Sequence, residues 1–485
     1  ASCALAIALV GASCSPHKVT NNPAPPVEVA DNYAAADGSS KALPERWWRD
    51  FGDSRLDALI ERTLEQNLQL EAAWARLQQA QQGARGARAG YYPSLDLSFS
   101  GQRQRFRSPF ADAEGGDAGG AIPETFDINQ FNGSLAAAYE VDIWRRVGNG
   151  ARAAALDAQA ARDAAEGLAI TLAAQVADGY FDLAFHNARK ELLLEQVKIN
   201  ETFLELTNLR FRQGLASALD IYQQQQLVIN RKGQLELVEG AIVVTRNRLA
   251  VLLGRSPGKV ELDAMKQLPD MPELPGLGIP ANLIERRPDV RAARSRVEAA
   301  DYRVAVAVAN KLPGLRLQGA LSIQNGEIEK LFDNILWQVL AAIAAPIFRG
   351  GQLDAEVKRN QAVVREQLAN YGDALITAVA EVENALAQER QQIKQIAQIE
   401  REVEISSNAL REARTRYREG LSDFLPVLSA LSTQQNAQLS LLQARRTALT
   451  YRVQLLRALG GSWTGDLADP KVDTKKDGRT SGQKG

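Results

Sequence analysis

The side chains that most often carry enzyme chemistry are few in this sequence and lie far apart. The 485 residues include two histidines, His17 and His186, and neither has cysteines or carboxylates at the spacing of a metal site. The sequence contains no Gly-x-x-x-x-Gly-Lys-Ser/Thr loop that would bind the phosphates of a nucleotide. It therefore predicts no metal and no cofactor, and it predicts that the protein is not an enzyme.

The one residue whose surroundings predict a covalent modification is Cys14. Cys3 is the only other cysteine, so we expect no disulfide and no thiolate metal site after residue 14. The apolar stretch 4–10 is followed by Gly11-Ala12-Ser13 and then Cys14, as in a bacterial lipoprotein signal without its basic start. We expect residues 1–13 to be a signal peptide and Cys14 to carry acyl chains such as palmitate. An ordinary secretory leader with a chance cysteine is the alternative.

Charge and hydropathy exclude two further classes of protein. The chain has 57 basic and 58 acidic residues and a formal net charge of −1, so no positive field attracts nucleic acid. After the leader, no apolar run approaches the about 18 residues that a membrane-spanning helix needs. If this chain crosses a bilayer, it must do so as strands.

Two copies of one turn organise the rest of the chain. Residues 210–219 and 416–425 share the order Arg, aromatic, Arg, polar, Gly-Leu and a final Leu, and Gly214 and Gly420 are 206 positions apart. A glycine between two long apolar-periodic runs supplies the left-handed backbone that ends one helix before the chain returns. Each copy is predicted to be the tip of a long helical hairpin.

The helices that lead to these tips are predicted from missing prolines and from sevenfold apolar spacing. No proline occurs in residues 124–256 or 347–425. Roughly 65 residues at about 1.5 Å each predict a rod on the order of 100 Å long. The spacing, which predicts a coiled-coil seam, is formed in the second copy by Val379, Leu386, Ile393, Ile396, Val403, Leu410 and Tyr417, and in the first by Leu192, Ile199 and Leu206.

Four segments alternate apolar residues with polar or small ones and are predicted to be strands. They are 95–101, 131–141, 315–323 and 337–345. A long loop, 107–129, is expected inside the first pair, and a short link near Asn325-Gly326 inside the second. Unpaired strand edges cost several kcal/mol per backbone group in lipid, and membrane barrels begin at about eight strands. Several copies must therefore combine their strands; two copies supply eight and three supply twelve.

These patterns predict two internal repeats within a longer chain. We expect Asn67 to cap one helix and Pro288 to begin another. The predicted segments are a signal peptide (1–13), a polar lipid-anchored tether (14–45), a first repeat (46–256), a second repeat (257–462) and a disordered tail (463–485).

Further motifs resemble the TolC-like outer-membrane efflux factors, in their lipoprotein branch. In chain order they are Trp47-Trp48, Phe51-Gly52-Asp53, Tyr-Glu-Val-Asp-Ile-Trp at 139–144, Arg-Pro-Asp-Val at 287–290, Pro-Ile-Phe-Arg-Gly-Gly at 346–351 and the two Gly-Leu tips. The resemblance implies a mostly helical α+β fold. A homotrimer would close a twelve-stranded outer-membrane β-barrel, four strands per chain, continued by a coiled-coil α-helical tunnel in the periplasm. Arg145 replaces a glycine frequent in the family, and we expect little effect.

The resemblance also implies passive export of drugs or other small toxic solutes through the outer membrane of a Gram-negative-type bacterium. The partners it implies are a periplasmic adaptor (membrane fusion) protein, an inner-membrane pump of the resistance-nodulation-division type and outer-membrane lipid. One alternative is the exit duct of a type I protein-secretion system; the lipoprotein leader and the Arg-Pro-Asp segment favour efflux. The other is a coiled-coil scaffold, which would not need the four alternating strands.

By the same resemblance, the second hairpin closes the tunnel, with ring-forming residues at Tyr417, Leu425 and Ser429. In a trimer, a leucine ring makes a dry constriction and an acidic ring a cation site. Ser429 stands where the family often has Asp, and Asp423 is the candidate replacement. Alternatively, Tyr417 and Leu425 are simply heptad core. The residues expected to dock the adaptor are those of the two tips, Gly214, Leu215, Gly420 and Leu421.

Overall fold

The computed structural model describes residues 15–28, 30–33, 45–107, 125–258, 267–274, 276–277 and 279–467. Cys14 and the predicted signal peptide lie outside these residues. The chain forms two compact units. Unit 1 contains the described residues of Ala1–Ala24, Gln79–Ala158 and Ser295–Leu368, and unit 2 those of Pro25–Gln78, Gln159–Arg294 and Ala369–Gly485.

The two halves of the chain have the same order of elements: a helix, two strands, a long helix and a return helix. The first half contains η2 (Trp47–Phe51), α1 (Ser54–Gln66), α2 (Leu68–Ala89), β1 (Ser94–Arg107), β2 (Thr125–Val141), α3 (Arg146–Arg212) and α4 (Ala218–Leu252). The second contains η3 (Pro280–Asn282), α5 (Leu283–Arg286), α6 (Pro288–Ala309), β3 (Gly314–Asn325), η4 (Ile328–Asp333), β4 (Ile335–Ala344), α7 (Gln352–Arg418), α8 (Leu425–Ala458) and η5 (Ser462–Asp466). Helices α3 and α7 have 67 residues each, which confirms the long helices.

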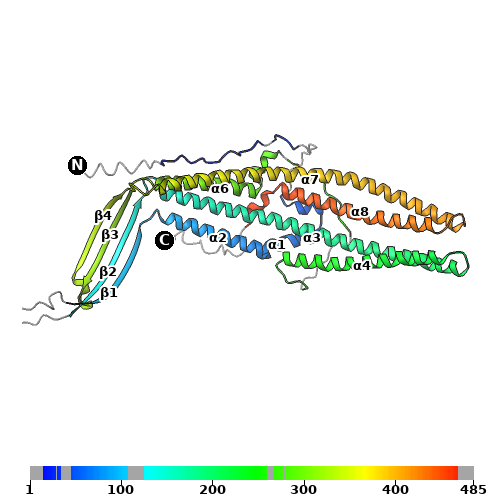
Figure 1. Ribbon diagram of the computed structural model, residues 1–485, viewed down its shortest axis with the longest axis horizontal. Coiled ribbons are helices and arrows are strands. Elements are labelled where there is room, and N and C mark those ends of the chain that lie inside the picture. The colour runs from blue at the N-terminus through cyan, green and yellow to red at the C-terminus, as the bar shows by residue number, and fades with distance from the viewer. Residues whose placement is uncertain are drawn as a thin grey trace, which may run out of the picture. The chain divides into compact units, whose positions relative to one another are not determined.

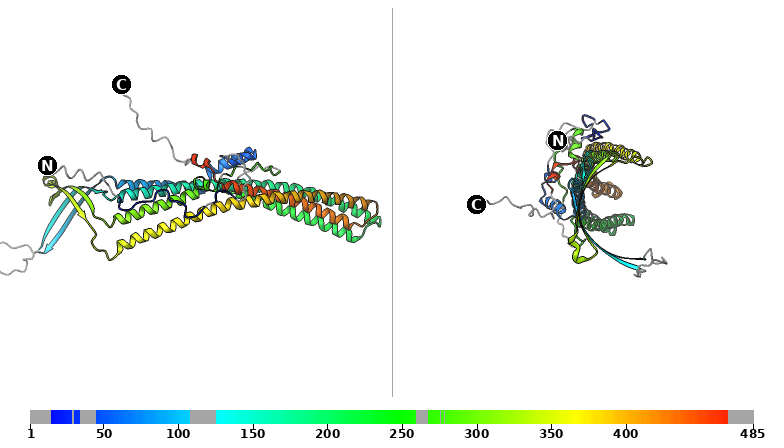
Figure 2. Two further views of the ribbon diagram at one scale, coloured as in Figure 1. Left: turned by 90° about the horizontal axis from the view of Figure 1, so that it is seen from above. Right: turned by 90° about the vertical axis from the view of Figure 1, so that its left-hand side faces the viewer.

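Unit 1 contains one antiparallel sheet with the strand order β1-β2-β3-β4 (Figure 1). The register aligns Leu97 with Leu135, Leu135 with Leu321, and Leu321 with Trp337 across the four strands. Because directly paired residues share a face, this register gathers the apolar side chains on one side, which we call the apolar face. The sheet is curved (Figure 2). The four predicted strands are confirmed.

The first hairpin is longer than predicted, because β2 begins at Thr125 and the predicted loop 107–129 includes its first residues. Two cross-strand contacts hold this extension together. Asp127 accepts hydrogen bonds from Arg103 and Arg105, and the rings of Phe106 and Phe126 stack with centroids 5.7 Å apart. Charged and aromatic cross-strand pairs stabilise a hairpin, although these residues do not continue the apolar alternation from which the strand was predicted.

The junction of β2 and α3 contains a strained residue. The Asp142 carboxylate accepts hydrogen bonds from the backbone N–H groups of Val147 and Gly148, at 2.9 and 2.7 Å, and so caps α3. Arg145 precedes the helix with a φ of +57°, in the left-handed region. That conformation costs a residue with a Cβ roughly 1–2 kcal/mol. The expectation that Arg145 has little effect stays a prediction, and this backbone cost argues against it.

Aromatic residues form the centre of the unit 2 core. Trp47, Trp48, Phe51 and Phe181 are buried there among residues of α1, α3 and α8. Trp463 joins them, with its ring edge-to-face to Trp48 at 4.9 Å. The predicted tail therefore does not begin at residue 463, because this indole anchors η5 to the core.

The predicted helix boundaries are confirmed where side chains set them. The Asn67 side chain accepts hydrogen bonds from the backbone N–H groups of Gln69 and Leu70, at 2.9 and 3.0 Å, and α6 begins at Pro288. Before these helices, the first described residues of the stretch predicted to be a tether contact α6. His17 Nε2 lies 2.6 Å from a carboxylate oxygen of Asp301 on α6.

Within a single chain, the coiled-coil prediction for α7 is confirmed for some residues and not for others. Leu410 and Tyr417 are buried, but Ile393 is 47% exposed. Polar side chains take the buried positions near it, since Glu389 and Gln392 are almost fully covered. In α3, likewise, Asn200 is buried and the predicted Leu206 is exposed. The seam keeps its sevenfold period but runs through polar residues, which an apolar pattern cannot identify.

One helix of the described chain, α3, contains an 18-residue window apolar enough to cross a membrane. This corrects the expectation that no such run exists. Because 72% of that window is buried inside the structure, its apolar composition belongs to a core helix of unit 2.

Candidate functional site

The two predicted tips have closely matching geometry. Gly214 has a φ of +74° and Gly420 a φ of +75°. The N–H of Leu215 donates to the carbonyl of Arg210, and the N–H of Leu421 to that of Arg416, both at 2.8 Å. These six-to-one bonds, each around a left-handed glycine, form the Schellman motif that ends a helix. The predicted role of the glycines as helix stops is confirmed.

The leucines that follow these glycines point into solvent. The side chains of Leu215 and Leu421 are 61% and 67% exposed. After Leu215, the chain enters α4 through a capping box, in which Ser217 and Asp220 each satisfy a backbone N–H of the other. After Leu421, Asp423 is exposed, and the N-cap of α8 is Phe424. Each turn thus presents one exposed leucine.

Tyr417, a predicted gate residue, lies inside the core of a single chain. It is 6% exposed, and its ring centroid is 5.4 Å from that of Phe424. The Arg210 guanidinium lies 4.1 Å from the centroid of the Tyr417 ring, in a cation–π contact. Burial raises the pKa of the Tyr417 hydroxyl above its ordinary value, while Arg210 acts in the opposite direction. This packing favours the heptad-core interpretation of Tyr417.

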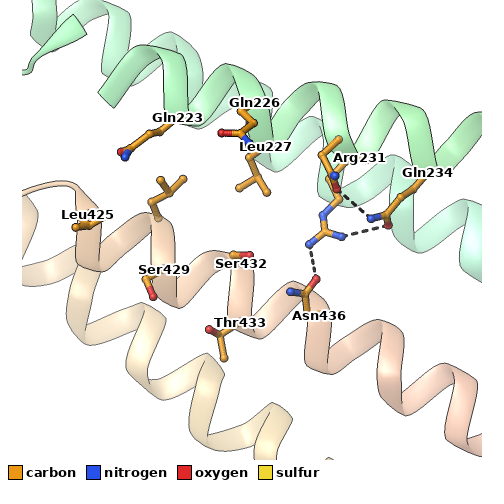
Figure 3. A pocket seen from close by; sticks show the side chains of 12 residues that line it. Gln223, Gln226, Leu227, Arg231, Gln234, Leu425, Ser429, Ser432, Thr433 and Asn436 are labelled. Atoms are coloured by element: carbon orange, nitrogen blue, oxygen red, sulfur yellow. Dashed lines mark hydrogen bonds between the residues drawn. The ribbon is translucent and has the colours of Figure 1, made fainter. Parts of the chain in front are cut away.

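Leu425 and Ser429, the other two predicted gate residues, line one groove between α4 and α8 (Figure 3). The groove has a volume of about 630 Å³. Most of its lining is polar but uncharged. The side chains come from Gln223, Gln226, Leu227, Asn230, Arg231 and Gln234 of α4 and from Leu425, Leu428, Ser429, Ser432, Thr433 and Asn436 of α8.

Arg231 is a buried cation at this groove, and sequence reasoning missed it. It is 2% exposed and points from α4 toward α8, where its Nη2 donates to Asn436 at 2.7 Å (Figure 3). Its Nε donates to Gln435 and its Nη1 to Gln234, both at 3.2 Å. Within the described part of the chain, no carboxylate forms an ion pair with it. Burial lowers the pKa of its guanidinium, which stays charged because arginine is not deprotonated in proteins.

The remaining predicted residues do not form a reactive site. His186 is half-buried, its Nδ1 has no hydrogen-bond partner, and burial lowers its pKa. Across the described ranges, no three His, Cys, Asp or Glu side chains are grouped in a way that could hold a metal ion. The predicted acyl site, Cys14, lies outside the described residues.

Comparison with known proteins gives consistent matches over most of the chain. A family model described as "Outer membrane efflux protein" matches residues 59–255 and 279–461. The chain is 31% identical to the pyoverdine export outer membrane protein OpmQ of Pseudomonas aeruginosa, covering 90% of this chain and 91% of OpmQ. It is 29% identical to the outer membrane protein OprJ of the same species, covering 95% of each. The solved outer-membrane channel OprN superposes with a TM-score of 0.85 at 25% identity, over 93% of this chain and 100% of OprN.

Proposed function

The chain belongs to the outer membrane efflux protein family, and we propose that three copies of it assemble into one channel. It is an outer-membrane exit duct of a tripartite efflux pump, a passive channel and not an enzyme. The observation that supports a trimer is that the sheet of one chain is open. Strands β1 and β4 each have one neighbour in the described sheet, and open edges are not stable in lipid. Three copies supply twelve strands, with β4 of one copy beside β1 of the next.

The apolar face supports a lipid-facing barrel. On β4, Trp337, Val339 and Ile343 alternate along the strand and are 79%, 79% and 75% exposed. The side chains between them include Gln338, which pairs with Ala320 on the other face. A strand of about 9–11 residues is long enough to cross a bilayer, and β4 has 10. The apolar face would therefore contact lipid, and the polar face would line the channel.

A second exposed surface on α4 supports association through the helices. Leu237, Val244 and Val251 recur every seven residues and are 76%, 67% and 61% exposed in a single chain. Sevenfold apolar spacing is the pattern of a helix that packs against another helix. In the trimer, this stripe on α4 would be covered by a neighbouring copy, so that the helices enclose a tunnel.

The gate, the tips and the lipid anchor complete the proposal. We propose that Leu425 and Ser429 narrow the tunnel near the second tip, with Asp423 as its nearest acidic group, and that Leu215 and Leu421 dock a periplasmic adaptor protein. An inner-membrane pump of the resistance-nodulation-division type would supply the energy. OpmQ is named for pyoverdine export; for this chain we propose small molecules, drugs included, as cargo that the pump selects.

The contacts of the N-terminal segment are compatible with an acyl anchor on Cys14. The backbone N–H of Thr20 donates to Asp301 at 2.7 Å, and Tyr302 donates to Asn21 at 3.1 Å. Both contacts hold the segment after Cys14 against α6, the helix that leads directly into β3. We propose that acyl chains on Cys14 anchor this segment to the outer membrane.

Native mass measurement of the detergent-solubilised protein tests this proposal directly. A trimer is expected, and the same sample should conduct ions after insertion into a planar bilayer. A monomer or dimer would contradict the twelve-stranded barrel. Deleting the protein from its native host should sensitise the cell to the small molecules that its partner pump exports, and reintroduction should restore resistance.

A further inference from the structure

The apolar face of the β1–β2 hairpin becomes basic toward the hairpin end. Leu95, Leu97 and Phe99 lie on this face of β1, and Arg103 and Arg105 continue it because side chains two residues apart point the same way. Arg107 follows in the same alternation. The residues paired with these three arginines are Asn129, Asp127 and Thr125. The side of the sheet that would face lipid therefore ends in a cluster of guanidinium groups.

The level of this cluster can be read from the strand register. Phe131 pairs with both Gly101 and Asn325, which ends β3, so the apolar residues of all four strands end near this level. Arg103 is two residues beyond Gly101 on β1. At about 3.3 Å per residue, this places it roughly 7 Å farther along the strand than Gly101. Side chains at that height meet lipid headgroups rather than acyl chains.

Among the residues that the structure describes, the cluster has more positive than negative charge. Arg103 Nη2 and Arg105 Nε donate to the two oxygens of Asp127, at 2.8 and 2.7 Å. Two guanidinium groups thus share one carboxylate, and their side chains remain 71% and 69% exposed. On the opposite face of the same strand, Gln102 and Gln104 are uncharged. The positive charge is therefore confined to the side that faces lipid in the proposed barrel.

We propose that Arg103 and Arg105 bind the phosphate groups of lipid headgroups at the outer surface of the membrane. This inference rests on the proposed barrel, in which the helices lie in the periplasm and the hairpin ends face outward. The guanidinium fork matches two phosphate oxygens at once, and an anionic headgroup attracts basic side chains placed at its level. Asp127 holds the two guanidinium groups in position without neutralising both. The bound lipid would fix the height of the barrel in the bilayer.

The test uses the full-length protein in lipid nanodiscs containing either phosphatidylcholine alone or phosphatidylcholine mixed with phosphatidylglycerol. Native mass spectrometry counts the phosphatidylglycerol molecules that stay bound, and thermal unfolding gives the midpoint in each lipid. We expect roughly tenfold preferential retention of phosphatidylglycerol by the wild type and a higher midpoint in its presence. Inorganic phosphate at millimolar concentration should leave the bound lipid in place; displacement would overturn the assignment to a headgroup.

A charge-relocated variant supplies the matched control. Q102R/R103Q/Q104R/R105Q has the same composition and net charge as the wild type, but it moves two arginines to the opposite face. It is expected to form the same trimer and to lose the lipid preference; retained preference would overturn the proposal. The simpler variant R103Q/R105Q should lose it too, and R103K/R105K should retain part of it.

Two other outcomes are equally decisive. The sequence between the strands contains four carboxylates, Asp112, Glu114, Asp117 and Glu124. If the arginines paired only with these carboxylates, the wild type would show no lipid preference. The variant R103Q/R105Q would then lower the thermal midpoint equally in both lipids. This result would overturn the inference. A wild type that fails to insert as a trimer would overturn the proposed barrel and this inference together.

Discussion

Asn200 of α3 and Gln435 of α8 exchange two amide hydrogen bonds, Asn200 Nδ2 to Gln435 Oε1 at 3.2 Å and Gln435 Nε2 to Asn200 Oδ1 at 3.3 Å. Both side chains are fully buried, and the same Gln435 oxygen accepts from Arg231 of α4. Three helices are therefore joined by amides around a buried charge near the groove that Leu425 and Ser429 line. Such a network specifies one register, and it is costly when one member loses its partner.

Removing one member of this network should destabilise the protein. Gln435→Leu leaves Arg231 Nε and the Asn200 amide without their partner, and an unsatisfied buried group costs about 1–3 kcal/mol. We expect a lower thermal midpoint for the detergent-solubilised trimer. The double variant N200L/Q435L removes both amides and should recover part of that loss. A single variant as stable as the wild type would show that the network contributes nothing.

Gln435→Glu should have the opposite effect at neutral pH, because it places a carboxylate beside the Arg231 cation. We expect the attraction of the guanidinium to exceed the opposing effect of burial and to hold the pKa of this glutamate below the about 4.3 of a free side chain. Because the folded-state pKa is depressed, the added stability should be present above that value and decrease as the pH falls through the folded pKa. Thermal midpoints measured from neutral to acidic pH test this. A midpoint that rises on acidification would contradict the predicted pairing.

Substitutions of Tyr417 and of Leu425 should change channel conductance differently if only Leu425 belongs to the gate. The Tyr417 hydroxyl has no hydrogen-bond partner in the structure, so Tyr417→Phe should leave stability and conductance nearly unchanged. Leu425 is 58% exposed, and Leu425→Ala should raise single-channel conductance with little change in thermal midpoint. Planar-bilayer recording compares the two variants. A conductance change in Tyr417→Phe would assign the gate to its hydroxyl.

The sequence predicted the elements better than the residues at which they touch. The helices and strands predicted from sevenfold and twofold apolar periods are found in the structure. Burial of an apolar stripe stabilises a helix, and burial of an apolar face stabilises a strand. Within a single chain, Ile393 is exposed, because the seam position near it is filled by Gln392, whose burial depends on partners from another helix. Arg231 was missed for the same reason. Nothing near it in the chain shows that Gln435 and Asn436, about 200 positions later, surround it.

The lipid-facing side of the sheet can be tested with neighbouring residues on one strand. An arginine on the lipid face of a barrel costs about 2–4 kcal/mol at the bilayer midplane. We therefore expect Val339→Arg, on the apolar face of β4, to reduce the amount of folded trimer in the outer membrane. Gln338→Arg adds the same charge to the opposite face and should insert normally. Membrane fractionation and heat-modifiable gel mobility report both. Equal insertion of the two variants would contradict the assigned face.

Arg145→Gly should stabilise the protein. The residue has a φ of +57°, so glycine would remove roughly 1–2 kcal/mol of backbone strain. Greater freedom of the unfolded chain would offset about half of that gain. A modest rise in thermal midpoint is expected. Arg145→Ala keeps the Cβ and removes the charge, so it should show no such rise. If alanine and glycine stabilise equally, the effect comes from charge and not from the backbone.

The two tips allow docking to be separated from folding. Leu215 and Leu421 are exposed apolar side chains on the two turns. A partner that covers these positions must remove water from the side chain at each of them. Burying an unpaired carboxylate costs several kcal/mol, so L215D/L421D should abolish capture of the adaptor protein and export. The trimer should still assemble, because neither leucine is buried in the chain.

Glycine variants of the same turns provide the control for that experiment. Around Gly214 and Gly420, an added Cβ would meet no atom within 4 Å, but each residue has a positive φ. G214A/G420A should therefore lower the thermal midpoint through backbone strain of roughly 1–2 kcal/mol per site while leaving both leucines exposed for the adaptor. Adaptor pull-down and drug-susceptibility assays on both double variants distinguish the two effects. If L215D/L421D exports normally, the adaptor contacts another surface and the tips serve only as turns.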